Sequence, residues 1–209
     1  MLTQEQALAI TMDAFQLGLL QSGLEARDFA QWISGEDISN ILEIGTRFGG
    51  SLYLMDRAAK AVGHVGYVIS VDHPWGHRDV NSPPHEALFH EKLSHVIEIF
   101  GNAHDEATLE QAVRTVSVRH PLDLLFIDSD HSRAGTKAQV EKYGRLVRPG
   151  GFIGFHDIAN GHECQGYYDE EIRPNFWTIT FTEPKNLYGI GVCQLPPGRS
   201  IEESRTVIS

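Results

Sequence analysis

Five short apolar runs follow one another between residues 41 and 157, and a segment of helix length separates each run from the next. In chain order the runs are ILEIG (41–45), YVISVD (67–72), VIEIFG (96–101), LDLLFID (122–128) and GFIGFHD (151–157). Apolar and polar residues alternate little within them, which is typical of parallel strands covered by helices on both faces. The pattern therefore predicts an α/β fold built on a doubly wound sheet.

Two more β-rich segments, NFWTITFTEP (175–184) and LYGIGVCQL (187–195), follow the fifth run. Pro184, Lys185 and Asn186 stand at their junction and leave no room for a crossover helix, so an antiparallel hairpin is predicted. Phe176 and Trp177 in this hairpin are expected in the core. Helices are expected near residues 51–61, 85–94, 105–118 and 133–147, the last ended by RPGG.

Residues 1–36 precede this pattern and are expected to form a helical cap on one compact domain of residues 37–209. Apolar side chains recur there at three-to-four spacing, at Leu8, Met12, Phe15, Leu19 and Leu20, which indicates an amphipathic helix. A second helical segment surrounds residues 29–33. We interpret the apolar stripe as the packing face of the cap or as a surface through which copies of the chain form a homo-oligomer.

Composition excludes several classes of protein. A net charge of -11 and a pI near 5.4 argue against a nucleic-acid partner, because such domains usually carry a basic stripe. No apolar run approaches the roughly 20 residues of a membrane span, and no basic leader precedes an apolar segment, so a cytoplasmic protein without a membrane partner is expected. Cys164 and Cys193 lack CxxC spacing and are interpreted as reduced thiols. A small-molecule partner is expected.

Each apolar run ends in a polar or glycine-bearing tail. The tails are EIGTRFGGS (43–51), VDHPW (71–75), FGNAHD (100–105), IDSDH (127–131) and FHDI (155–158). Ligands of open parallel sheets bind beyond the carboxyl ends of the strands, so these tails are expected to converge on one cleft.

The first two tails have the pattern of a nucleoside site. Gly45, Gly49 and Gly50 permit a sharp turn and close approach to a ligand, and Asp72 can accept both hydroxyl hydrogens of a ribose. The alternative is that the glycines only form a tight turn and Asp72 caps a loop. Glu43 would repel the pyrophosphate of a nicotinamide dinucleotide but suits an ammonium or sulfonium group, which favours S-adenosylmethionine.

Taken together, ILEIGTRFGGS, VISVDHP, FGNAHD, LLFIDSDHS, LVRPGGFIGFHDI and YGIGVCQL resemble the class I S-adenosylmethionine-dependent methyltransferases over about residues 38–195. The chain is most similar to metal-dependent small-molecule O-methyltransferases, both the catechol type and the group of cephalosporin-biosynthesis and macrolide-sugar methyltransferases. The resemblance implies a Rossmann-like sheet of order 3-2-1-4-5-7-6. It also implies that Glu43, Gly45 and Ser51 surround the methionine portion, Asp72 holds the ribose, and Asn102, Ala103 and His104 border the adenine. Thr46, Gly49, His73 and Asp128 complete the predicted cofactor site.

The same resemblance implies a divalent metal on Asp128, His156 and Asp157, at the ends of two adjacent strands. Such an ion would clamp two acceptor oxygens and lower the pKa of the hydroxyl to be methylated. Oxygen ligands favour Mg²⁺, whereas the imidazole of His156 suits Mn²⁺ and other transition metals better. Alternatively His156 turns away and Asp130 substitutes, the acids only cap the following helix, or no metal binds.

His131 stands where the catechol-type enzymes have a catalytic lysine and the macrolide-sugar group a histidine. It is expected to remove the acceptor's proton, the alternative being a structural histidine in the turn. The loop with His73, Trp75, His77 and His85 is interpreted as a cover over the site, and a spare zinc site there is the other reading.

The predicted function is metal-assisted O-methylation of a small molecule, such as a sugar, a catechol-like ring or a natural-product hydroxyl. A metal-independent methyltransferase and a non-catalytic module that binds S-adenosylmethionine are the alternatives. A nicotinamide oxidoreductase is disfavoured by the glycine turn and the C-terminal hairpin.

Overall fold

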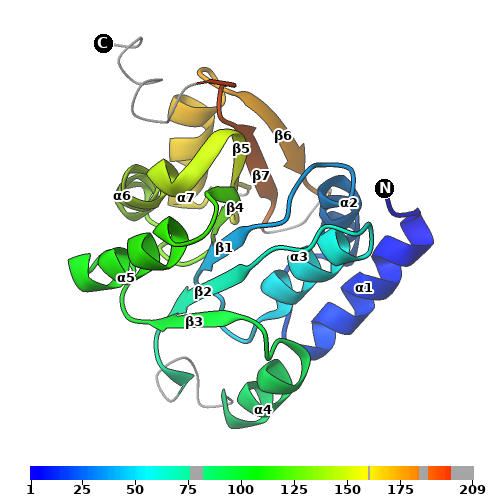
Figure 1. The fold of residues 1–209 in the computed structure, drawn as a ribbon. Helices are drawn as coiled ribbons and strands as arrows, with labels where there is room; N and C mark the ends of the chain where they lie inside the picture. Colours follow the sequence, from blue (N-terminus) through cyan, green and yellow to red (C-terminus); the bar gives the residue numbers. More distant parts are fainter. Residues whose placement is uncertain (76–81, 160, 184–187, 199–209) are drawn as a thin grey trace.

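A computed structural model describes residues 1–75, 82–159, 161–183 and 188–198. In this part of the chain a seven-stranded sheet has the order β3-β2-β1-β4-β5-β7-β6 (Figure 1). The strands are β1 Ile41–Ile44, β2 Val68–Asp72, β3 Ile97–Phe100, β4 Leu122–Ile127, β5 Val147–Phe155, β6 Trp177–Phe181 and β7 Ile190–Gln194. Strands β1 to β5 are parallel, and β7 is antiparallel to both β5 and β6. The predicted sheet order and hairpin are confirmed; Pro184, Lys185 and Asn186 lie outside the described residues.

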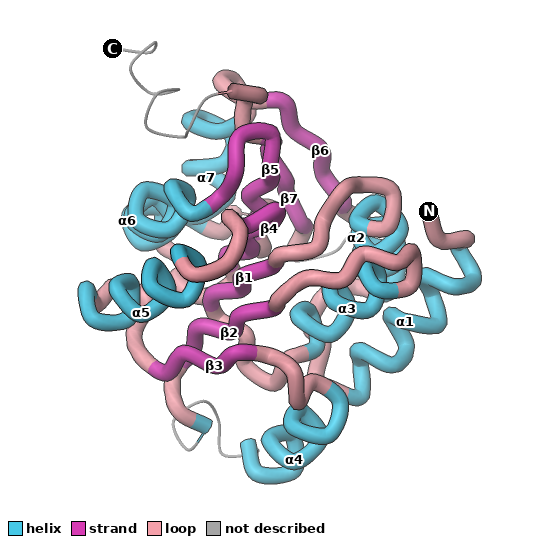
Figure 2. Tube along the Cα trace, in the orientation of Figure 1, coloured by secondary structure: helices cyan, strands magenta, loops and turns pink. Residues whose placement is uncertain are grey.

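Helices cover both faces of the sheet (Figure 2). On one face lie α1 Gln4–Gln16, α2 Gly23–Ile33, α3 Gly50–Lys60 and α4 Ser82–Lys92, and on the other α5 Glu106–Ser117, α6 Arg133–Tyr143 and α7 Glu163–Tyr167. Successive strand residues point to opposite faces, so Ile41 packs in the first of two apolar cores while Leu42 and Ile44 pack in the second. Burial on both faces explains why the strands read as uninterrupted apolar runs. None of the described helices has the length and apolar character to span a membrane.

The helix bounds differ slightly from those predicted. Helix α4 begins at Ser82 instead of His85, because proline is tolerated in the first turn of a helix. Helix α6 ends at Tyr143, and a 3₁₀ turn, Gly144–Leu146, continues the chain toward β5.

Most of the N-terminal apolar stripe faces outward; only Leu19, which lies beyond the end of α1, is buried. Helix α1 packs against α2 and α3 through small residues, with Ala7, Thr11 and Ala14 buried. Met12 is 57% exposed and Leu8 43% exposed. Small side chains on the inner face allow the helices to approach closely and leave the larger ones on the surface. Homo-oligomer formation through this surface stays a prediction.

Two side-chain expectations have different outcomes. Trp177 is 55% exposed on the edge strand β6, so its predicted place in the core is wrong, whereas Phe176 packs half-buried against the second core. Cys164 and Cys193 are both free and buried, as expected of reduced thiols.

Candidate active site

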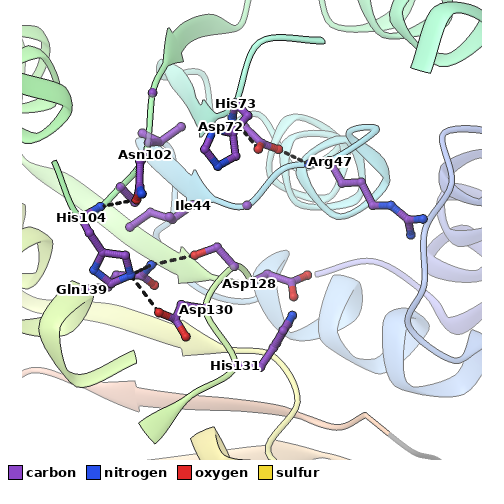
Figure 3. A pocket seen from close by; sticks show the side chains of 15 residues that line it. Ile44, Arg47, Asp72, His73, Asn102, His104, Asp128, Asp130, His131 and Gln139 are labelled. Carbon is purple, nitrogen blue, oxygen red and sulfur yellow. Dashed lines mark hydrogen bonds and ion pairs between the residues drawn. The ribbon is translucent and has the colours of Figure 1, made fainter. Parts of the chain in front are cut away.

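Two cavities lie at the carboxyl edge of the sheet. The larger, of about 490 Å³, is lined by residues that follow β1, β2, β3 and β4. The smaller, of about 220 Å³, is lined by the segment between α1 and α2, the β1–α3 turn, the tails of β4 and β5, and Tyr188. Gly45, Arg47, Asp128 and His131 line both cavities. These four residues form a shared wall, and Figure 3 shows Asp128 and His131 near one another on it.

Backbone amides hold the carboxylate of Asp72 at the end of β2. Arg47 N donates to Asp72 Oδ2 at 2.5 Å, and His73 N donates to Asp72 Oδ1 at 2.6 Å (Figure 3). This fixes the side chain against the wall of the larger cavity before any ligand arrives. The predicted cofactor residues that line the larger cavity are Gly45, Asp72, His73, Asn102, Ala103, His104 and Asp128.

The far end of the larger cavity carries a polar network. His104 Nε2 lies 3.0 Å from Asp130 Oδ2, and Ser132 N donates to Asp130 Oδ1 at 2.9 Å. Burial opposes ionisation of Asp130, but the bonds from Ser132 and His104 outweigh it and hold the pKa of this carboxyl below its usual range. Asp130 therefore caps the turn before α6. Asp130 is not part of the described group of candidate metal ligands, and its role as a substitute ligand stays a prediction.

The glycines of the β1–α3 turn make room for protein atoms. Gly45 has φ of +87°, and a Cβ there would lie 2.1 Å from the carbonyl oxygen of Asp128. Gly49 has φ of +96°, and a Cβ there would lie 2.5 Å from the ring of Phe89. Gly45 thus lets the tails of β1 and β4 touch. Gly49 lines neither cavity and lies against Phe89 of α4; its place in the cofactor site stays a prediction.

Glu43 lies beneath the start of α3 and also lines neither cavity. Its side chain points to the same face of the sheet as Ile41, because alternate strand residues share a face. The residue is 0% exposed, Ser51 Oγ donates to Oε1 at 2.5 Å, and Oε2 has no hydrogen-bond partner. Burial raises the pKa of Glu43 to about 8. Ser51 and Thr46 line the smaller cavity, and Glu43 supports Ser51 from behind; the contact of Glu43 with the cofactor stays a prediction.

His131 and Asp157 form a pair at the wall between the cavities. His131 Nδ1 lies 2.7 Å from Asp157 Oδ2, and the His131 side chain is 52% exposed. The hydrogen bond to Asp157 raises the pKa of His131. Burial opposes ionisation of Asp157, but its bond with His131 and the charge of His156 outweigh this and lower its pKa. Asp157 has φ of 58°, a strained backbone of the kind that clusters at functional sites.

His156 forms a second pair deeper in the fold. Its Nδ1 lies 2.9 Å from Asp128 Oδ1 and 3.4 Å from Asp157 Oδ1. The ring stacks on Tyr188 at 5.5 Å between centroids, and Nε2 is buried without a hydrogen-bond partner. Burial alone would lower the pKa of His156, but Asp128 and Asp157 outweigh it and raise the pKa to about 9.

The implied metal can be tested against these side chains. Asp128, His131 and Asp157 bring one ligand atom each within 4.8 Å of one another, with His131 in place of the predicted His156. Asp157 Oδ1 also makes no hydrogen bond. However, Asp157 Oδ2 is bonded to His131 and Asp128 Oδ1 to His156, so a divalent ion that bound through these two oxygens would have to displace both imidazoles. In this arrangement the carboxylates do not fit a divalent metal.

Several lining residues had no recognisable signal in the sequence. Gln21 Nε2 donates to Asp128 Oδ2 at 3.4 Å across 107 positions of chain, and Leu20 and Tyr188 line the same smaller cavity. Arg47, with φ of 49°, lies on the shared wall. Within the described residues, Arg47 and Asp157 are the two non-glycine residues with positive φ, and this backbone strain marks the site in the structure.

The predicted loop cover is described only in part. His73 lines the larger cavity, and the ring of His85 stacks on Phe48 at 4.1 Å. Trp75 is 5% exposed and donates from Nε1 to Glu98 Oε1 at 2.9 Å, so it anchors the start of the loop in the core. His77 lies outside the described residues, and a zinc site formed by the histidines of this loop stays a prediction.

Several solved structures with this fold contain a bound cofactor, which is SAH or SAM where it is named. An O-methyltransferase from Bacillus cereus in complex with SAH is 19% identical, with a TM-score of 0.56 over 92% of this chain and 90% of that chain. The O-methyltransferase TomG from Streptomyces achromogenes, involved in tomaymycin synthesis and in complex with SAM, is 16% identical, with a TM-score of 0.57 over 91% and 90%. Cofactor-bound Rv0187 from MTB is 17% identical, with a TM-score of 0.61 over 92% and 90%.

The sequence profile of a family described as "Methyltransferase domain" matches residues 42–158, from β1 through the tail of β5. This match spans more than half of the chain and contains the predicted catalytic and metal-ligating residues. The resemblance to the class I methyltransferases is confirmed, and the chain belongs to this methyltransferase domain family.

Proposed function

We propose that the protein transfers a methyl group from S-adenosylmethionine to a hydroxyl group of a small molecule, with His131 as the general base. The observation that carries the proposal is the His131–Asp157 pair, which stands on the wall between the two cavities. Sugar, catechol-like and natural-product hydroxyls are the acceptor classes. Similarity to the SAH-bound and SAM-bound O-methyltransferases supports the choice of cofactor and of oxygen as the acceptor atom.

The larger cavity is the proposed site of the cofactor. Its residues fit, because Asp72 offers a carboxylate fixed by two amides for a ribose, and Asn102 and Ala103, the residues expected to border the adenine, line the same cavity. Thr46 and Ser51, which line the smaller cavity, are proposed to face the methionine end. When bound, S-adenosylmethionine supplies the methyl group on an activated sulfonium.

The smaller cavity is the proposed site of the acceptor. Leu19, Leu20 and Gln21 from the segment between α1 and α2 contribute to its wall, and His131 and Asp157 contribute the polar end. Asp157 holds Nδ1 of His131, which leaves Nε2 as the nitrogen that takes the hydroxyl proton. The pair thus fixes both the tautomer and the orientation of the base.

A metal-assisted form of the same reaction is the rival. It would use Mg²⁺ or Mn²⁺ on Asp128 and Asp157, and the convergence of these acids with His131 supports it. We favour the metal-independent form, because both acids already accept hydrogen bonds from histidines.

The test combines binding and turnover on protein treated with a chelator. Calorimetry is expected to show one S-adenosylmethionine site, which Asp72→Asn weakens by about 10-fold, or about 1.4 kcal/mol. Formation of S-adenosylhomocysteine is then measured over a panel of sugars, catechols and other alcohols. His131→Gln is expected to lower kcat roughly 10²–10⁴-fold without changing cofactor binding.

His90→Gln is the matched control. The His90 side chain is 50% exposed and pairs with Glu98 at 2.9 Å, much as His131 pairs with Asp157, but it lines neither cavity. It should keep full activity. Absence of cofactor binding would reject the proposal, and turnover that His131→Gln leaves unchanged would remove the general base. Activity restored only by Mg²⁺ or Mn²⁺ would favour the metal-assisted rival.

A further inference from the structure

We propose that the Nδ1–H group of His156 occupies the place between Asp128 and Asp157 that a divalent ion would need, so that this chain organises its site without a metal. For its meaning in the reaction this inference rests on the proposed function. Its statement about metal binding can be tested without any turnover.

The geometry places one nitrogen between two carboxylates. Nδ1 of His156 is 2.9 Å from an oxygen of Asp128 and 3.4 Å from an oxygen of Asp157. A metal ion would stand in the same position, bonded to the same two oxygens at a shorter distance, close to 2.0–2.2 Å for the usual divalent ions. Space between the carboxylates is therefore already used by a hydrogen-bond donor.

The ring of His156 is held where it is from several sides. Its backbone N–H donates to Ile127 O at 3.0 Å, directly beyond the last paired residues of β4 and β5. The residue is 4% exposed, and its ring stacks on Tyr188. Cys164 Sγ contacts the carbonyl oxygen of Asp157 at 2.8 Å, which pins the following residue as well. The two backbone contacts fix the position from which the side chain extends, and moving the imidazole aside would break its stacking on Tyr188 and its pairing with Asp128.

This arrangement makes His156 a positioning residue for the proposed base. Its Nδ1 lies 3.4 Å from Asp157 Oδ1, an ion-pair contact without a hydrogen bond, while Oδ2 of the same carboxylate pairs with Nδ1 of His131. A hydrogen-bond donor of the chain thus stands where a metal would otherwise organise the two carboxylates. A metal clamps two acceptor oxygens, so an enzyme without one requires a single hydroxyl. The inference therefore extends the acceptor class from vicinal diols to molecules with one isolated hydroxyl group.

The experiment is a titration with Mn²⁺ alone, in which the electron paramagnetic resonance signal of free Mn²⁺ reports binding. Wild type and Asp128→Asn are expected to give the same curve, because the net charge of -11 allows only diffuse surface binding that both share. His156→Asp replaces the imidazole by a carboxylate, an oxygen ligand beside Asp128 and Asp157, and should gain a site at least about 10-fold tighter. His156→Asn, equal in size to Asp but uncharged, is the matched control and should gain none.

A wild-type Mn²⁺ site that disappears in Asp128→Asn would overturn the inference. This comparison needs neither His156 variant to fold. If His156→Asp folds and gains no site, the claim that His156 stands in a metal position is also overturned.

Calorimetry with S-adenosylhomocysteine separates this inference from the proposed function. Wild type that binds S-adenosylhomocysteine and lacks the Mn²⁺ site supports both, and turnover of monohydroxyl acceptors after chelation should follow. If wild type binds neither S-adenosylhomocysteine nor Mn²⁺, the proposed function is rejected, while the statement about metal binding is supported. If wild type binds S-adenosylhomocysteine and also has the Mn²⁺ site, the inference is overturned but the proposed function is not.

Discussion

Replacement of Glu43 by glutamine should change how the stability of the protein depends on pH. The carboxyl group is 0% exposed beneath α3, and its Oε2 has no hydrogen-bond partner. Glutamine keeps the shape and the oxygen that accepts from Ser51, but it cannot ionise. The substitution therefore isolates the ionisation of one buried carboxyl group.

The size of the effect follows from the pKa of Glu43. It ionises at 4.5 when exposed and at about 8 in the folded chain, because burial disfavours the charge. Between these values the folded state holds more protons than the unfolded state, so wild type loses stability as pH rises. With about 1.4 kcal/mol for each pH unit, the free energy of unfolding of wild type should fall by about 3 kcal/mol more than that of Glu43→Gln between about pH 5 and about pH 7.5.

Urea denaturation of both proteins at several pH values in this range measures the difference. Groups that titrate in both proteins cancel when one curve is subtracted from the other, provided that they are independent of Glu43. Glu110→Gln is the matched control, because the Glu110 side chain is 60% exposed on α5. The difference in free energy of unfolding between Glu110→Gln and wild type should not change with pH.

Parallel curves for wild type and Glu43→Gln, within about 0.5 kcal/mol, would refute this reasoning. They would mean that the folded carboxyl ionises as easily as the unfolded one. Glu43 would then have to be exposed to water or paired with a cation, and its place beneath Ser51 would be wrong.

Asp157→Asn should lower kcat by a part of the roughly 10²–10⁴-fold that the base contributes. Loss of the carboxylate should also move the rise of kcat with pH downward, because Asp157 raises the pKa of His131; an unmoved midpoint in the pH profile would separate the two residues. Gly45→Ala should destabilise the fold by roughly 2–5 kcal/mol in urea denaturation, through strained φ and collision with Asp128. Gly63 has φ of +90° but open space around it, so Gly63→Ala should lose only the stability that the backbone strain costs. If both variants lost the same free energy of unfolding, a collision of the added methyl group with Asp128 would not explain the loss in Gly45→Ala.

Much of the fold could be predicted from the order of residues. Helices on both faces bury all the residues of the central strand β4, so its largely apolar run LDLLFI identifies it without tertiary information. The parallel direction of β1 to β5 then brings their tails to one edge of the sheet. This is why the residues that line the two cavities were found at the ends of the apolar runs.

The pairing of side chains within those tails was decided only by tertiary structure. Regular alternation stops where a strand ends, and the left-handed backbone of Asp157 directs its carboxylate to His131, while His156 bonds to Asp128. No local pattern encodes such a turn. For the same reason the sequence grouped His156 with the metal ligands.

Contacts between distant segments were equally beyond the sequence. Gln21 reaches Asp128 only because α1 and α2 fold back on α3, and Gly49 faces Phe89 only because α4 packs there. The sequence by itself determined the sheet, the carboxyl edge at which its polar residues gather, and the family, since these depend on local periodicity, motifs and chain direction. Tertiary structure decided which polar atoms face a cavity and which are buried behind it, because that depends on the approach of segments far apart in the chain.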